Sequence, residues 1–242
     1  DRYGHDVFPL RHRAITVQAA SIGIATGAYA LSFGAISVAS GLSPLQTQVL
    51  SLLMFTGASQ FALVGVLGAG GGVIAAVLTA WLLGARNGLY ALSLAPLLRG
   101  RWWRAPAAAQ FTIDESTAMA LAHPEPPAAS RHAFWSTGLA IYVLWNLGTL
   151  VGALGASVLH DPRTLGLDAA IPAGFIALLW PRLVGRTAWA VALVSAALAI
   201  ALTPVLRPGI PVLACALVAF AAVALTRRST PEPGQTTTDG AA

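Results

Sequence analysis

Long apolar runs alternate with short polar connections along this sequence. Three runs, at 14–40, 73–98 and 133–159, are each long enough to cross the roughly 30 Å hydrocarbon core of a bilayer as a helix. Two further runs, at 187–206 and 210–225, fit shorter spans. The pattern therefore predicts an all-α fold, a polytopic transmembrane helical bundle of about six spans.

Two other runs are interrupted by polar residues, and we expect them to form re-entrant or broken membrane helices. The run 45–67 has a polar middle at Thr56–Gln60, and the run 105–122 is short and carries acidic residues. A helix start is predicted just before the first of these runs, because Ser43 suits the N-cap position and Pro44 the first helical position.

The boundaries of the membrane domain follow from the polar ends of the chain. Residues 1–13 are polar and carry arginines, so we predict a cytoplasmic N-terminal segment. Residues 14–228 form the predicted transmembrane permease domain, which includes a short apolar piece at 169–180. Residues 229–242 are rich in Pro, Thr and Gly, and this composition predicts a disordered C-terminal tail.

Composition agrees with a membrane protein. Hydrophobic residues make up 56% of the 242 residues and charged residues 10%, which is too apolar for a soluble protein of this size. The net charge of +5 does not indicate nucleic-acid binding, because the arginines are scattered between apolar runs, as topology signals are. Cys215 is the single cysteine, so no disulfide framework or thiolate metal site is expected, and no cofactor is predicted.

The distribution of arginines leaves two topologies open. If the run 45–67 enters and leaves by one face, the basic loop 99–104 lies in the cytoplasm, as the positive-inside rule favours. Alternatively the run 105–122 crosses as an extra span, and one basic loop lies outside. We prefer the first, because inserting Asp114 and Glu115 costs several kcal/mol each. Both topologies place both termini on the cytoplasmic side of a bacterial inner membrane.

Arg86 is the one arginine inside a long apolar run, and its guanidinium stays charged. It must therefore find a carboxylate or a water-filled cavity. Tyr90 and Ser93 follow at spacings that place them on the same helix face, with Asn87 at its edge. This stripe can bind the carboxylate of a substrate. The alternative is a structural ion pair that locks two helices. We favour the substrate-binding interpretation, because ionisable residues inside a membrane are costly and usually lie along pathways.

The adjacent acids Asp114 and Glu115 also have two interpretations. Thr112 stands three residues before Glu115, which matches a capping box at a helix start. Alternatively, one carboxylate takes up a proton or pairs with Arg86 inside the protein. Both can hold at once, because a half-helix that starts at membrane depth needs a cap and also presents its N-terminus to an anion.

Small and neutral polar residues mark possible helix contacts. Ser59 and Gln60 can bind substrate by hydrogen bonds or join two helices. The small residues of the first run let another helix approach closely, and similar glycine spacing recurs at 138–155, as in paired repeats. Nothing in the sequence identifies what covers the first of these faces, so we expect a small membrane subunit there. That face contains Gly23, Gly27 and Gly34.

Several segments of the chain resemble the AzlC family. They are Phe33-Gly34 with Gly41–Pro44, Phe55–Phe61, Arg86–Ala95, Thr112–Ser116, and Leu165–Asp168 followed by Ile171–Ala173. The resemblance implies the large subunit of a branched-chain amino-acid exporter that works with a small hydrophobic AzlD-like subunit. Family members commonly have Arg-His where this chain has Arg86-Asn87, so a proton role for that histidine is absent here.

The function implied is secondary export of branched-chain amino acids, driven by protons, and not an enzymatic reaction. Arg86 would neutralise the substrate carboxylate, and Asp114 or Glu115 would bind the amino group or carry the proton. Two rivals remain: a non-transporting scaffold, and an intramembrane enzyme that uses the two acids, although adjacent side chains on a helix diverge by about 100°. The apolar side chain of the substrate would lie among aromatic residues: Phe33, Phe55 and Phe61.

Overall fold

The computed structural model describes residues 4–98, 102–158, 176, 179–180 and 183–228, with side chains described between residues 12 and 222. These residues belong to two compact units, 1–178 and 179–242, which are treated separately below. The described part is helical and contains no strand, which confirms the all-α prediction. The predicted disordered tail, most of the apolar piece 169–180 and the motif at 165–173 lie outside the described residues.

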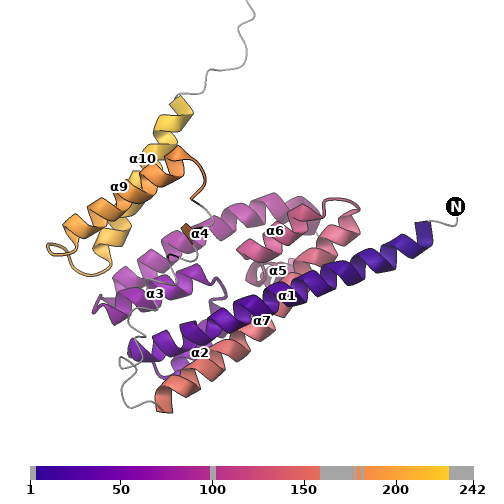
Figure 1. The fold of residues 1–242 in the computed structure, drawn as a ribbon, viewed down its shortest axis with the longest axis horizontal. Helices are drawn as coiled ribbons and strands as arrows, with labels where there is room; N and C mark the ends of the chain where they lie inside the picture. Colours follow the sequence, from indigo (N-terminus) through magenta and orange to yellow (C-terminus); the bar gives the residue numbers. More distant parts are fainter. Residues whose placement is uncertain (1–3, 99–101, 159–175, 177–178, 181–182, 229–242) are drawn as a thin grey trace, which may run out of the picture. The chain divides into compact units, whose positions relative to one another are not determined.

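Among the described residues, three helices are long and apolar enough to cross a membrane: α1 (Gly4–Ala39) from His12 onward, α4 (Val73–Leu98) and α7 (Pro127–Val158). Shorter apolar helices, α3, α9 and α10, accompany them. The polar N-terminal segment is continuous with α1, because this helix already begins at Gly4. The first unit contains α1 (Gly4–Ala39), α2 (Pro44–Leu53), α3 (Ala58–Gly68), α4 (Val73–Leu98), the 3₁₀ helix η1 (Trp102–Arg104), α5 (Ala105–Gln110), α6 (Asp114–Ala122) and α7 (Pro127–Val158), and the second contains α9 (Arg186–Leu202) and α10 (Ile210–Arg228) (Figure 1).

Helices α1 and α7 pack along most of their length and run in the same direction (Figure 1). Their backbones approach so closely that added Cβ atoms would clash: one at Gly34 would overlap the Thr149 carbonyl oxygen, and one at Gly152 the Leu31 carbonyl oxygen. Near the start of both helices the rings of His12 and His132 stack, 4.4 Å apart.

This packing corrects one interpretation of the sequence. The glycine face of α1 is covered by α7 of the same chain and needs no other subunit to cover it. Gly23 lies against Ala140 and Leu144, and Gly27 lies against Leu144. The two glycine-spaced runs that resembled repeats are the two sides of this seam.

The parallel direction of α1 and α7 limits the topology. If α1, α4 and α7 all cross the bilayer, the chain must return to its starting face before α7 begins. Helix α4 supplies one crossing, so the segments 44–68 and 105–122 either both cross or both enter and leave by one face. Both topologies derived from the arginines satisfy this condition. An arrangement in which only one of the two segments crosses does not.

The segment 44–68 is a broken helix, as its polar middle predicted. Ser43 caps α2 and its backbone N–H donates to Gln46, while Pro44 occupies the first helical turn. The helix stops at Leu53, and α3 begins after Gly57, whose φ of +61° is accessible to glycine at little steric cost.

The segment 105–122 is broken in the same way. Helix α5 ends at Gln110, and α6 begins at Asp114. The two breaks touch, because the Gln110 side-chain amide donates to the Leu52 carbonyl at the end of α2, at 2.9 Å. The rings of Phe55 and Phe111, one from each break, pack edge to face, 6.4 Å apart.

Polar side chains join the first broken helix to α7. Ser51 donates to Thr149 at 3.2 Å, and Gln48 to Asn146 at 3.3 Å. The Tyr142 hydroxyl donates to the carbonyl of Leu52. Breaking a helix frees backbone carbonyls that have no water partner in lipid, so donors of this kind are needed where a membrane helix is interrupted.

Candidate functional site

The inner face of α4 forms one wall of the candidate site. The face is defined by the buried residues of the helix: Ala76, Thr79, Ala80 and Leu94. At about 100° per residue, Asn87 and Tyr90 lie near the centre of that face. Both are half-buried, as expected from this position. Ser93 does not belong to the site: it is exposed and donates to the carbonyl of Leu89.

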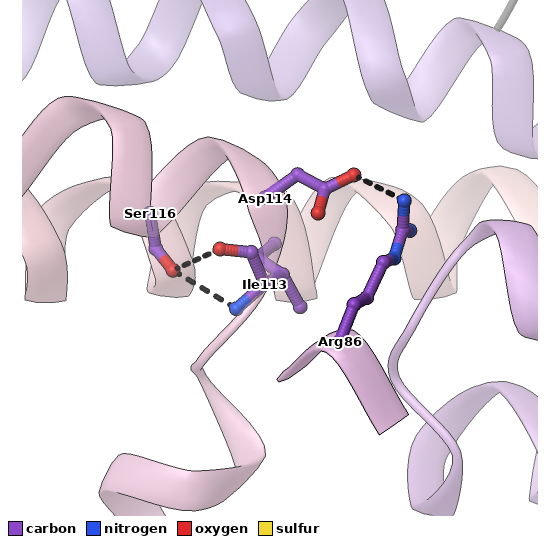
Figure 2. A network of polar contacts seen from close by, with 4 residues as sticks. All are labelled: Arg86, Ile113, Asp114 and Ser116. Atoms are coloured by element: carbon purple, nitrogen blue, oxygen red, sulfur yellow. Dashed lines mark hydrogen bonds and ion pairs between the residues drawn. The ribbon is translucent and has the colours of Figure 1, made fainter. Parts of the chain in front are cut away.

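Arg86 and Asp114 form an ion pair at 3.1 Å, between Nη1 and Oδ2. Figure 2 shows the arginine reaching from the middle of α4 to the start of α6. The side chains are 27% and 19% exposed, so each is largely enclosed by protein. The sequence allowed the acids either a capping role or an ion pair with Arg86. The structure shows the ion pair for Asp114. The Arg86 Nε atom is buried without a hydrogen-bond partner among the described residues.

The start of α6 differs in one detail from the sequence-based prediction. The capping box of Thr112 with Glu115 is wrong, because the helix begins one residue later, with Ile113 at the N-cap. The Ser116 hydroxyl accepts from the Ile113 N–H at 3.2 Å (Figure 2). It donates to the Phe111 carbonyl at 2.6 Å. The Thr112 hydroxyl instead donates back to Ala108.

Asp114 and Glu115 nonetheless occupy the first turn of α6, as the sequence predicted. The N–H groups there carry partial positive charge, which favours carboxylates. Two sources of positive charge, the helix end and the guanidinium of Arg86, therefore face the carboxylate of Asp114.

Gln60 and Ser59, the two polar residues at the start of α3, differ in their use. The Gln60 amide is fully buried and spans the break: its oxygen accepts from the Gly57 N–H, and its nitrogen donates to the Leu50 carbonyl. Ser59 is 1% exposed, and its hydroxyl has no partner among the described residues. It faces Gly84 of α4, since a Cβ on that glycine would lie 3.4 Å from the Ser59 Oγ.

The aromatic residues proposed to receive a substrate side chain belong to the core around the breaks. Phe33 is fully buried and stacks on Trp145, with ring centres 5.9 Å apart. Phe61 meets Phe33 edge to face, and Phe55 meets Tyr142. These rings fill the space among themselves, so a bound apolar side chain requires at least one of them to move.

Sequence reasoning missed the residues that satisfy the broken backbone. Gln110 and Tyr142 both donate to the carbonyl of Leu52 at the end of α2, whereas Gln48 donates to the side chain of Asn146 and joins α2 to α7. Their signal was present, because a glutamine in an apolar run needs a hydrogen-bonding partner. In the part of the chain that the structure describes, no three His, Cys, Asp or Glu side chains are grouped as a metal ion requires.

Comparison with known proteins supports the resemblance noted in the sequence. The family described as AzlC protein matches residues 21–159, more than half of the chain, and this region contains both breaks and the Arg86–Asp114 pair. The chain belongs to the AzlC family. No solved structure matches it.

Three relatives show how far this similarity extends. An uncharacterized membrane protein of Helicobacter pylori strain 26695 is 30% identical over 150 residues, which are 61% of this chain and 65% of the relative. One from Archaeoglobus fulgidus is 31% identical over 160 residues, or 65% and 69% of the two chains. Inner membrane protein YgaZ of Escherichia coli K12 is 30% identical over 157 residues, or 62% and 64%. The match thus spans just under two thirds of the Helicobacter and Escherichia proteins, and the AzlC-family chain described here is a membrane protein.

Proposed function

We propose that this AzlC-family chain is a permease subunit of the bacterial inner membrane that exports branched-chain amino acids, driven by the proton gradient. The observation that carries the proposal is the Arg86–Asp114 pair between the middle of an apolar helix and a helix break. Charged side chains at membrane depth are costly and are usually found along substrate or ion pathways. A zwitterionic amino acid presents both charges to such a site.

The two charged groups of the substrate need different partners in the site. The Asp114 carboxylate is the natural partner of the substrate ammonium group, and Asp114 or Glu115 would carry the coupled proton. The substrate carboxylate needs hydrogen-bond donors instead. Two sets are available near the inner face of α4: the guanidinium of Arg86, and the start of α3 with Ser59.

A small AzlD-like subunit is part of the proposal. Its support is the family resemblance alone, because α7 already covers the glycine face that had favoured a partner on sequence grounds. The test compares the chain with and without that subunit.

Reconstitution tests the proposed function directly. The purified chain, alone and with the small subunit, is placed in liposomes, and counterflow of a panel of labelled amino acids is measured. We expect counterflow of leucine, isoleucine and valine, dependent on a pH gradient in net transport and increased by the subunit. Counterflow of other compounds only would overturn the proposed substrate, and its absence in all preparations would overturn transport.

One observation favours a second candidate, a membrane scaffold in which the pair only joins two helices. In this structure Arg86 and Asp114 are already in contact at 3.1 Å, as a structural pair would be. A scaffold predicts that neutralising both residues together leaves the function of the protein intact. An intramembrane enzyme has no comparable support.

A further inference from the structure

The two helix breaks are built on the same plan. Each begins with Phe-Thr, at Phe55-Thr56 and at Phe111-Thr112, and each has its N-cap two residues after the phenylalanine. In each, the side chain three residues after the N-cap accepts a hydrogen bond from the N-cap N–H. These side chains are Gln60 in the first break and Ser116 in the second.

The two starts differ in charge. The first two residues of α6 are Asp114 and Glu115, so this helix end carries its own anions. The corresponding residues of α3 are Ala58 and Ser59, and no acidic residue lies in its first turn. Of the first N–H groups of α3, that of Gln60 donates to the Gly57 carbonyl at 3.0 Å, which leaves those of Ala58 and Ser59 to face an anion. The partial positive charge at a helix start favours one.

A second observation indicates a ligand at the start of α3. Ser59 is only 1% exposed, yet its hydroxyl has no hydrogen-bond partner among the described residues. The Thr56 hydroxyl, at the same break, is also buried and lacks one. Buried hydroxyls in proteins are nearly always hydrogen-bonded, so these two require an acceptor.

Gly84 is the residue of α4 that lies in front of Ser59, and it presents no side chain to the hydroxyl. Because Ser59 is 1% exposed, a carboxylate reaches this hydroxyl only when α3 and α4 move apart there. A methyl group at Gly84 would lie 3.4 Å from the Ser59 oxygen, at ordinary contact distance and without a clash. On α4, Gly84 and Arg86 point about 160° apart, so the start of α3 and the Arg86–Asp114 pair lie on opposite edges of the face that carries Asn87 and Tyr90.

We propose that the start of α3 is the carboxylate subsite of this protein, with the Ser59 hydroxyl and the first N–H groups of α3 as donors. Arg86 remains paired with Asp114. The identity of the ligand rests on the proposed function. The subsite itself accepts the carboxylate that every α-amino acid shares.

Binding measurements on three variants test the subsite. Ser59→Ala removes the hydroxyl, and Gly84→Ala fills the space in front of it. Gly88→Ala is the matched control, because it adds the same methyl group to α4 at a place where no atom of the described part of the chain lies within 4 Å. The probes are leucine and 3-methylbutylamine, which is leucine without its carboxylate. Affinities are measured by calorimetry, and melting temperatures verify that each variant is folded.

We expect Ser59→Ala and Gly84→Ala to weaken leucine binding about tenfold, the effect of one lost hydrogen bond to a charged group, and to leave amine binding unchanged. Gly88→Ala should bind both probes as the wild type does. A merely structural role of Ser59 would weaken both probes equally. The subsite is overturned if both variants lose affinity for leucine and for 3-methylbutylamine to the same extent. It is also overturned if neither variant loses affinity for leucine.

The same measurements separate this inference from the proposed function. If the wild type binds another amino acid but not leucine, and does so through Ser59 and Gly84, the subsite stands and the branched-chain substrate is wrong. If leucine is bound equally by all four proteins, the function stands and the subsite is wrong. If the wild type binds no amino acid, both are overturned.

Discussion

The α1–α7 pair and the α4 region are both apolar in sequence, but they are built in opposite ways. In the most apolar stretch of each helix, 39% of the residues of α1 and 33% of those of α7 are buried, against 17% for α4. Backbone contact at glycines joins α1 to α7, whereas an ion pair joins α4 to α6. Close backbone packing leaves little freedom of movement, while a side-chain pair can open and close. Under the proposed function, α1–α7 is the frame, and α4 with its partners is where a substrate would bind.

The largest effect is expected where the frame is closest. Gly152→Ala would place a methyl group in the carbonyl of Leu31, and we expect a loss of about 3 kcal/mol or more in stability, because neither backbone can retreat. Gly155→Ala, on the same helix with no described residue within 4 Å of the added methyl group, is the control and should melt as the wild type does or slightly higher. Equal melting temperatures for the two variants would break the comparison.

The next effect concerns the α4 side. Asp114→Asn or Arg86→Ala alone leaves a charge without its partner, and we expect a loss of about 2 kcal/mol, less than in a fully buried pair because both side chains are partly exposed. The double variant should recover stability but not amino-acid export from loaded cells. Wild-type export by a stable double variant would make the pair purely structural and would support the scaffold. Arg86→Lys keeps the charge without the planar fork and should fold.

A smaller effect tests the break between these regions. Gln60→Ala removes both hydrogen bonds that span residues 50–57, and we expect a loss of about 1–3 kcal/mol with reduced export. Ser43→Ala, which removes the exposed cap of α2, should cost about 1 kcal/mol and leave export unchanged. If Gln60→Ala exports normally, the geometry of the break does not matter for function.

The last test alters neither region and determines how both lie in the membrane. Single cysteines replace Ser43, Arg104 or Glu125, all exposed, in a Cys215→Ala background, and membrane-impermeant reagents label them from either side. Because α1 and α7 are parallel, positions 43 and 125 should be labelled from opposite faces. Position 104 decides between the two topologies, being cytoplasmic if the broken segments do not cross. Labelling of 43 and 125 from one face would contradict the parallel packing in the membrane.

Local patterns were enough to predict the elements. Ser43 with Pro44 indicated the start of α2, and the polar middle of 45–67 indicated a break, since each signal lies within one turn of the feature it causes. The sequence left Arg86 either a carboxylate or a water-filled cavity, and the structure has the carboxylate of Asp114. Pairing the two residues removes the cost of burying an isolated cation and an isolated acid together.

Two features could not be predicted because competing partners are decided by tertiary packing. The sequence favours Thr112 as the N-cap, but α6 begins one residue later, after Ile113, whose side chain makes no cap hydrogen bond and packs in the aromatic core. The cover of the glycine face is equally invisible, since α7 lies far away in the chain and any small-residue face fits several partners.

The capped breaks have a mechanical consequence. In each break the N-cap N–H is bound by a side chain of the following half-helix, and Gln60 also holds the last turn of the preceding one. Each break is therefore a defined structure held by specific hydrogen bonds, and not a stretch of unwound helix. A half-helix that pivots at such a joint carries its own cap with it, so a change of orientation need not unwind a turn or expose backbone to lipid. The half-helices would then rotate as rigid bodies about the capped breaks while the protein changes its orientation in the membrane. Only side-chain contacts between helices would be exchanged.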